Sequence, residues 1–154
     1  MIKVLIADDH AVVREGLKQI LGDTPDMLAG GEAEDGQQVL DKVHAESWDV
    51  VILDITMPIL NGLDVLKQLK DEKPDLPVLI LSMHSEAQYV LRALKYGASG
   101  FVTKDSASDE LIRALHKVMN GGRYVSSSLA EKLAIDIGGD ASKLPHELLT
   151  DREF

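Results

Sequence analysis

The feature that most constrains the fold is a regular alternation between short apolar runs and longer amphipathic stretches. The apolar runs predict β-strands over residues 2–7, 27–33, 50–53, 78–81 and 99–103. Short, nearly continuous apolar runs suit parallel strands that are covered on both faces. The run at 27–33 (MLAGGEA) is the weakest, and mainly its place in the alternation identifies it as a strand.

Between these runs, apolar residues recur at the spacing of amphipathic helices. In the last such stretch, Leu111, Leu115 and Val118 form a stripe that we assign to the core. Glycine or proline marks the ends of the helices, as at Gly22, Pro74, Gly97 and Gly121. Five strand–helix units predict an α/β fold, in which helices cover both faces of a doubly wound parallel sheet.

The pattern changes after residue 122. Ser128 and Glu131 fit a capping box, so we expect a short helix in a linker. We therefore divide the chain into a main domain, a linker with a short helix, and the start of a further segment: 1–122, 123–148 and 149–154.

Charge and composition exclude several classes of function. Lysine and arginine total 16 against 26 aspartates and glutamates, and the net charge of −10 argues against binding of nucleic acid or anionic membrane by this chain. Cysteine is absent, which excludes disulfides and thiol catalysis, and the five histidines form no HxH or HExxH pair, so we predict no zinc site. The first apolar run is too short for a signal peptide or a membrane span, and we expect a cytoplasmic protein.

Polar side chains stand where the predicted strands end. Asp8 and Asp9 follow the first strand, Asp54 the third, Ser82 the fourth and Lys104 the fifth. In an open parallel sheet, ligands bind at the carboxyl ends of the strands. We therefore expect these five side chains to meet at one edge of the sheet.

Three neighbouring carboxylates need a cation. Two of them about 4 Å apart repel by roughly 4 kcal/mol at an effective dielectric constant near 20. Carboxylate oxygens suit Mg²⁺ or Mn²⁺, and a metal, a lysine and a hydroxyl together fit the oxygens of a phosphoryl group. A carboxylate can itself be the nucleophile, and Asp54 is the best placed because its strand lies beside the first.

At these residues the chain resembles the receiver domain of bacterial two-component response regulators. The matching pieces are Asp8-Asp9, the stretch 54–58 (DITMP), Ser82 and the stretch 101–104 (FVTK). The stretches 8–17 (DDHAVVREGL) and 121–126 (GGRYVS) resemble the NarL/FixJ subgroup, in which a LuxR-type helix-turn-helix domain follows a linker. The stretch 149–153 (LTDRE) resembles the opening of that domain, so we expect the chain to end before it.

The resemblance implies a flavodoxin-like (βα)5 fold with strand order 2-1-3-4-5. It also implies that Asp54 accepts a phosphoryl group from a sensor histidine kinase. Asp9, Asp54 and the backbone carbonyl of Thr56 would ligate Mg²⁺, Asp8 would act largely through water, and Lys104 would contact the phosphoryl oxygens.

The resemblance further implies a conformational switch. Ser82 would move to bond the phosphoryl group while Phe101 packs inward behind it, and Thr56 and His84 would tune attack by water on the acyl phosphate. The implied protein is a phosphoacceptor rather than an enzyme. Its partners would be the kinase, a second copy bound on phosphorylation, and DNA through the helix-turn-helix domain alone; no membrane partner is expected.

Three alternatives stay open. The first is a receiver-like interaction module that works without phosphorylation. The second is a haloacid-dehalogenase-like phosphatase, which needs an aspartate two residues after the nucleophile, where this chain has Thr56. The third is a flavin-binding module, but the two aspartates after the first strand would repel a phosphate that lacks a metal.

Overall fold

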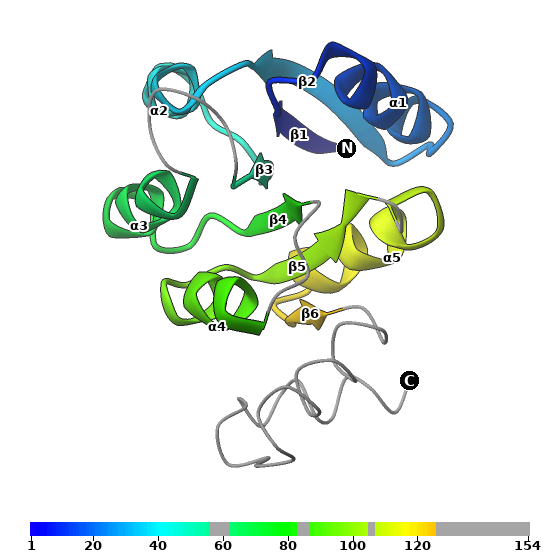
Figure 1. The fold of residues 1–154 in the computed structure, drawn as a ribbon. Coiled ribbons are helices and arrows are strands. Elements are labelled where there is room, and N and C mark those ends of the chain that lie inside the picture. The colour runs from blue at the N-terminus through cyan, green and yellow to red at the C-terminus, as the bar shows by residue number, and fades with distance from the viewer. Residues whose placement is uncertain (56–61, 83–86, 105–106, 126–154) are drawn as a thin grey trace.

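The computed structural model describes residues 1–55, 62–82, 87–104 and 107–125, and the side chains of all of these except 87–89 and 109. Strands and helices alternate along these residues, as Figure 1 shows. Their order is β1 (Ile2–Ala7), α1 (Ala11–Gly22), β2 (Met27–Ala33), α2 (Gly36–Ala45), β3 (Val50–Asp54), α3 (Gly62–Glu72), β4 (Val78–Ser82), α4 (Ala87–Lys95), β5 (Gly100–Thr103), α5 (Ala107–Met119) and β6 (Tyr124–Val125). The predicted linker helix and the segment 149–154 lie outside the described residues.

All the described strands pair in parallel in one sheet of order β2-β1-β3-β4-β5-β6. Helices α1 and α5 cover one face, and α2, α3 and α4 cover the other (Figure 1). This confirms the α/β fold and the order 2-1-3-4-5. Strand β6, which pairs with the outer edge of β5, was not predicted, because a strand of two residues shows no periodicity.

Each face of the sheet has its own hydrophobic core. The core under α1 and α5 includes Leu17, Ile52, Leu111, Leu115 and Val118, which confirms that the α5 stripe is internal. The core on the other face includes Leu5, Val39, Leu66, Val90 and Phe101. Full burial of one such side chain contributes about 1.5–3 kcal/mol, so the two layers hold the helices firmly against the sheet. No helix in the described part of the chain is long and apolar enough to cross a membrane.

The middle of strand β2 carries two glycines, Gly30 and Gly31, where the ring of Trp48 packs. A Cβ atom on Gly31 would stand 2.7 Å from Cη2 of the Trp48 ring, and one on Gly30 would stand 3.1 Å from Cζ3. The indole N–H donates to the Lys42 carbonyl at 3.0 Å, and Lys3 Nζ stands 4.4 Å from the centroid of the ring. The weak pattern of the 27–33 run therefore reflects space needed by an aromatic side chain rather than the absence of a strand.

Candidate functional site

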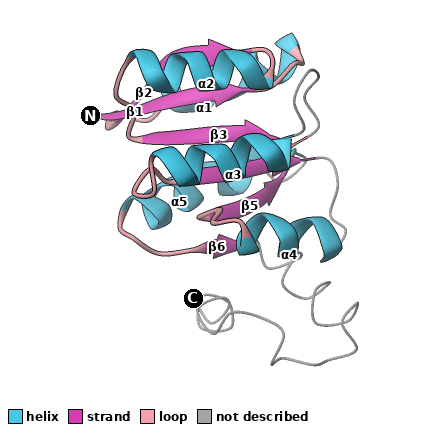
Figure 2. Cartoon of the chain, turned by 90° about the vertical axis from the view of Figure 1, so that its left-hand side faces the viewer, coloured by secondary structure: helices cyan, strands magenta, loops and turns pink. Residues whose placement is uncertain are grey.

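The carboxyl ends of the strands bring the predicted residues together at one edge of the sheet. All the described strands run parallel, and the strand arrows labelled in Figure 2 point toward that edge. Asp8 follows β1 directly, Asp54 is the last residue of β3, Ser82 is the last residue of β4, and Lys104 follows β5. Asp54 and Ser82 are thus the last residues of their strands, whereas the sequence pattern had predicted that each would directly follow its strand.

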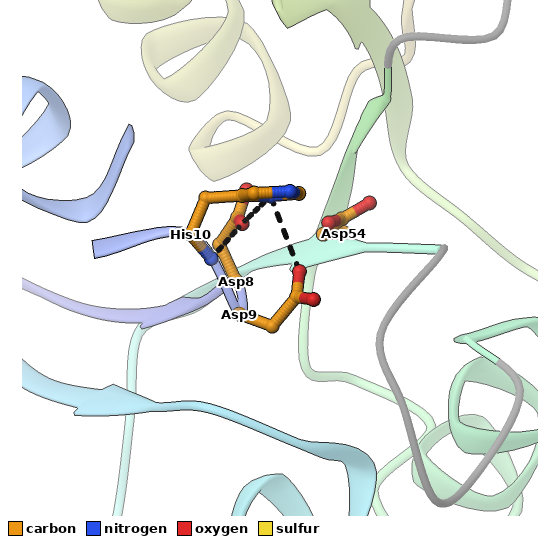
Figure 3. A group of neighbouring side chains, drawn as sticks. All are labelled: Asp8, Asp9, His10 and Asp54. Atoms are coloured by element: carbon orange, nitrogen blue, oxygen red, sulfur yellow. Dashed lines mark hydrogen bonds and ion pairs between the residues drawn. The ribbon is translucent and has the colours of Figure 1, made fainter. Parts of the chain in front are cut away.

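Three aspartates form the centre of the site. Asp54 and Asp8 are buried, with 0% and 1% of their surface exposed, whereas the side chain of Asp9 is 32% exposed. Ligand atoms from these aspartates and from His10 all lie within 4.8 Å of one another (Figure 3). The predicted acidic cluster therefore exists, with two members inside the protein and one at its surface.

Lys104 joins the two buried aspartates. Its Nζ atom lies 3.0 Å from Asp8 Oδ2 and 3.1 Å from Asp54 Oδ2, and its side chain is only 7% exposed. Burial pushes the pKa of Lys104 down, but the adjacent carboxylates of Asp8 and Asp54 outweigh it, so the pKa of Lys104 is raised. The lysine is thus held as a cation beside Asp54, as the strand-end argument predicted.

The same cluster offers a place for a divalent cation. Asp8 Oδ2 is buried and accepts no hydrogen bond, so the Lys104 ammonium compensates it only as an ion-pair partner. Unsatisfied buried carboxylate oxygens are costly, and carboxylates are the ligands that hard cations such as Mg²⁺ prefer. The donor set of Asp8, Asp9 and Asp54 therefore fits a divalent metal ion.

His10 is a member of the site that the sequence analysis missed. Its backbone N–H donates to Asp8 Oδ1 at 2.8 Å, and its ring Nδ1 lies 2.9 Å from the same oxygen and 3.2 Å from Asp9 Oδ1 (Figure 3). Lys104 Nζ also lies 3.2 Å from this nitrogen. A search for paired histidines could not find it, because its partners are carboxylates; its position directly after the acidic pair was the available signal.

The predicted switch residues lie on β4 and β5, the strands that follow β3 in the sheet. Ser82 is fully buried and pairs in register with Thr103 of β5. Phe101 is also fully buried, in the core with Val90, and pairs in register with Val125 of β6. Of the other predicted site residues, Thr56 and His84 lie outside the described residues.

A pocket of about 510 Å³ lies at the opposite edge of the sheet, and Trp48, Asp49, Pro74 and Pro77 contribute to its lining. None of the predicted site residues that the structure describes lines it, and Asp49 in its lining precedes β3, whereas Asp54 ends that strand. The acidic cluster at the carboxyl ends of the strands therefore lies outside this pocket.

Comparison with known families gives a match over most of the chain. The model of the response regulator receiver domain matches residues 4–116. The transcriptional regulatory protein DegU of Brevibacillus brevis is 38% identical over 132 residues, which cover 86% of this chain and 56% of DegU. The response regulator GacA of Pseudomonas syringae is 34% identical over 155 residues, which cover 100% of this chain and 72% of GacA.

A solved structure agrees with these relatives. The fold is similar to that of a two-component response regulator of the LuxR family from Aurantimonas, with a TM-score of 0.83 and 29% sequence identity. The similarity covers 88% of this chain and 96% of the other. The chain spans little more than half the length of DegU.

Proposed function

This chain belongs to the response regulator receiver domain family, in its NarL/LuxR branch, and on that basis we propose that Asp54 is its phosphoacceptor. The observation that carries the proposal is the ion pair between Lys104 Nζ and Asp54 Oδ2 at 3.1 Å, inside a cluster of three carboxylates. A buried carboxylate beside a fixed cation at the end of a central strand can act as a nucleophile toward phosphorus.

The proposed reaction is a transfer between two side chains. An oxygen of Asp54 attacks the phosphorus atom of a phosphohistidine on a sensor kinase. The new O–P bond forms as the N–P bond breaks, and the imidazole nitrogen leaves with the electron pair of that bond. Lys104 then exchanges part of its contact with Asp54 for the negatively charged phosphoryl oxygens.

We further propose that Asp8, Asp9 and Asp54 hold Mg²⁺, with Mn²⁺ as a substitute, and that the Thr56 carbonyl contributes a ligand. When bound, the metal neutralises charge on the transferred phosphoryl group. The unsatisfied Asp8 Oδ2 atom and the donor chemistry of the cluster support this assignment.

Ser82 and Phe101 are the proposed switch. Ser82 lies at the end of the strand next to β3, from where its hydroxyl can donate to the phosphoryl group. Thr103 of β5 pairs in register with Ser82, and Phe101 lies two residues before Thr103 on the same strand. We assign Thr56 and His84 to tuning the rate of hydrolysis, and we regard the chain as a phosphoacceptor rather than an enzyme.

The proposed partners follow from the family. A sensor histidine kinase supplies the phosphoryl group, and phosphorylation promotes a homodimer. Control of transcription through a DNA-binding domain beyond the receiver is proposed for the complete protein, because this chain covers 56% of DegU and 72% of GacA. We assign residues 1–122 to the receiver and 123–148 to a linker, of which the first residues form β6 in the receiver's sheet.

Intact-mass spectrometry after incubation with acetyl phosphate and Mg²⁺ tests the phosphoacceptor. We expect a single phosphate adduct that is absent in Asp54→Asn and retained in Asp64→Asn, which changes an exposed aspartate of α3. An adduct that persists in Asp54→Asn contradicts the assignment. No adduct on a protein that binds Mg²⁺ favours the interaction module, and catalytic release of phosphate from monoesters favours the phosphatase.

A further inference from the structure

Arg14 of α1 lies against the loop that carries the acidic pair. Its side chain is 12% exposed, and its guanidinium Nη1 donates to the backbone carbonyl of Asp8 at 2.7 Å. That carbonyl belongs to the peptide group that joins Asp8 to Asp9. Arg14 therefore contacts the backbone between two of the carboxylates and touches none of their side-chain oxygens in the described contacts.

Asp8 is held through both of its backbone groups, because its carbonyl accepts from Arg14 and its N–H is also bonded. The Asp8 N–H donates to the Ala33 carbonyl at the end of β2, at 3.0 Å. With its amide bonded to β2 and its carbonyl bonded to α1, Asp8 has little freedom to rotate either flanking peptide. The direction in which Asp9 leaves the strand depends on the second of these bonds, because Asp9 is attached to the peptide that Arg14 holds.

Two glutamates, Glu32 within β2 and Glu34 directly after it, fix the orientation of the Arg14 guanidinium. Arg14 Nε donates to Glu32 Oε1 at 3.0 Å, and Nη2 donates to Glu34 Oε1 at 3.3 Å. Glu32 is shared with Lys18, whose Nζ donates to its other oxygen at 3.1 Å. A planar guanidinium can bond several acceptors in fixed directions, which a lysine ammonium on a flexible stem cannot reproduce.

We propose that Arg14 is a positioning residue for the metal and phosphoryl site, acting through the Asp8–Asp9 peptide it holds. The inference rests on the proposed function, since it concerns the affinity of the same acidic cluster for Mg²⁺. Groups that orient the ligands of a metal without touching it typically change its affinity about 10–100-fold when they are removed. We expect a loss near the lower end, because the Ala33 bond remains.

The charge of Arg14 makes the sign of the effect informative. Removing a cation near three carboxylates should by itself strengthen the binding of Mg²⁺, because the site becomes more negative. Loss of positioning should weaken it. A weaker Mg²⁺ complex in Arg14→Ala is thus a result that neither electrostatics nor a general loss of stability produces at temperatures well below unfolding.

Lys18→Ala is the matched control. It also removes one positive charge from α1 and one bond to Glu32, but the described partners of Lys18 are Glu32 and Glu15 rather than Asp8. Titration of each apo-protein with MgCl2 by calorimetry, with the amide signals of Asp9 and His10 followed by NMR, compares the variants. We expect about tenfold weaker binding in Arg14→Ala and unchanged or tighter binding in Lys18→Ala.

Arg14→Lys keeps the test decisive if Arg14→Ala does not fold. Lysine retains the positive charge but cannot form all the hydrogen bonds of the guanidinium. The Mg²⁺ affinity of Arg14→Lys should therefore fall between those of the wild type and Arg14→Ala. Equal affinities for wild type, Arg14→Lys and Lys18→Ala would overturn the inference. A wild-type protein that shows no Mg²⁺ binding would instead overturn the proposed metal site, so the two failures are distinguishable.

Discussion

Lys104 is the cation that compensates two carboxylates inside the protein. Asp8 and Asp54 are 1% and 0% exposed, and Lys104 bonds or pairs with both within 3.1 Å. Removing one member of a buried ionic group typically costs about 3–5 kcal/mol, because the remaining charge is left uncompensated. The stability of this edge of the sheet therefore depends on a residue assigned to function.

Replacement of this lysine should destabilise the protein in a way that Mg²⁺ partly reverses. We expect Lys104→Met to lower the free energy of unfolding by about 3 kcal/mol in metal-free buffer, and by less in MgCl2, since a bound cation replaces the lost charge. Urea denaturation with and without MgCl2 measures both values. Lys95→Met, at an exposed position of α4, should change little; a loss in Lys104→Met that Mg²⁺ does not reduce contradicts this view.

Gly62 lies against the backbone that follows Asp54, the proposed phosphoacceptor. Its N–H donates to the Ile55 carbonyl at 3.2 Å, and a Cβ atom at Gly62 would stand 2.2 Å from Ile55 Cα. That contact is with backbone, so Gly62→Ala must displace the residue that follows Asp54. We expect a loss of about 1–3 kcal/mol in unfolding free energy and slower phosphorylation by acetyl phosphate.

Gly16→Ala is the control for that substitution. A Cβ atom at Gly16 meets nothing within 4 Å, and the position lies within α1. Alanine there should stabilise the protein by about 0.4–1 kcal/mol, because it restricts the unfolded chain and favours the helix. Equal effects of the two substitutions in urea denaturation would show that the approach to Ile55 is unimportant.

Reasoning from strand ends found the residues whose chemistry is visible in the sequence. Asp54 and Lys104 stand out because a charged residue directly follows or ends an apolar run. Arg14 and His10 belong to the same site, yet each lies in or before a helix, where a charged side chain ordinarily faces solvent. Their contacts depend on how α1 packs over β1 and β2, which is a tertiary property that a pattern along the chain does not contain.

The smallest element, β6, has a larger role than its length indicates. It pairs with β5 through Gly100 and Phe101, and a Cβ atom on Gly100 would stand 2.7 Å from the Tyr124 carbonyl oxygen. Tyr124 also donates its hydroxyl to Glu110 of α5 at 2.9 Å. The segment that leaves the receiver is therefore tied to the strand of the proposed switch and to the last helix.

The Tyr124 hydroxyl should make stability depend on alkaline pH. Burial, with the bond to Glu110 and its charge, raises the pKa of Tyr124 to about 12 from an ordinary 10. The unfolded chain ionises first, so this contribution is complete below pH 10 and is lost as the pH rises to about 12. We expect the unfolding free energy to fall more steeply over that interval in the wild type than in Tyr124→Phe.

Urea denaturation at several pH values between 10 and about 12 measures that difference. Both proteins contain Lys104, whose pKa is also raised. Its contribution to the pH dependence of stability is the same in both and therefore cancels from the comparison. Glu110→Gln keeps the phenol but removes the neighbouring charge, so its slope should lie between the other two. Parallel curves for wild type and Tyr124→Phe would contradict the assignment.

At the level of elements, the alternation of strands and helices was predictable, but the reasons for two details were not. The strand at 27–33 has few β-forming side chains because its glycines face Trp48, which comes from a different part of the chain. Strand β6 exists because β5 offers it an edge. Local pattern predicts an element when its own residues drive it, and fails when a distant neighbour supplies the cause.

On the scale of the whole molecule, the net charge of −10 has two effects. Repulsion among like charges over the surface works against the compact state and is weakened by any salt. Part of the negative charge, however, lies in the cluster of Asp8, Asp9 and Asp54, which a divalent ion can bind specifically. Added cations should therefore stabilise the fold by a general and a specific mechanism.

These two contributions can be separated by comparing MgCl2 with NaCl at matched ionic strength. Both salts screen the surface, but only Mg²⁺ is expected to occupy the proposed site, and a ligand at 100 times its Kd stabilises the native state by about 2.7 kcal/mol. We expect a higher Tm in MgCl2 than in NaCl for wild type and Asp64→Asn. In Asp9→Asn, which changes the one partly exposed carboxylate of the cluster, the excess should disappear while the common salt effect remains. Identical Tm values in the two salts for the wild type would mean that screening alone acts, and that the acidic edge holds no metal.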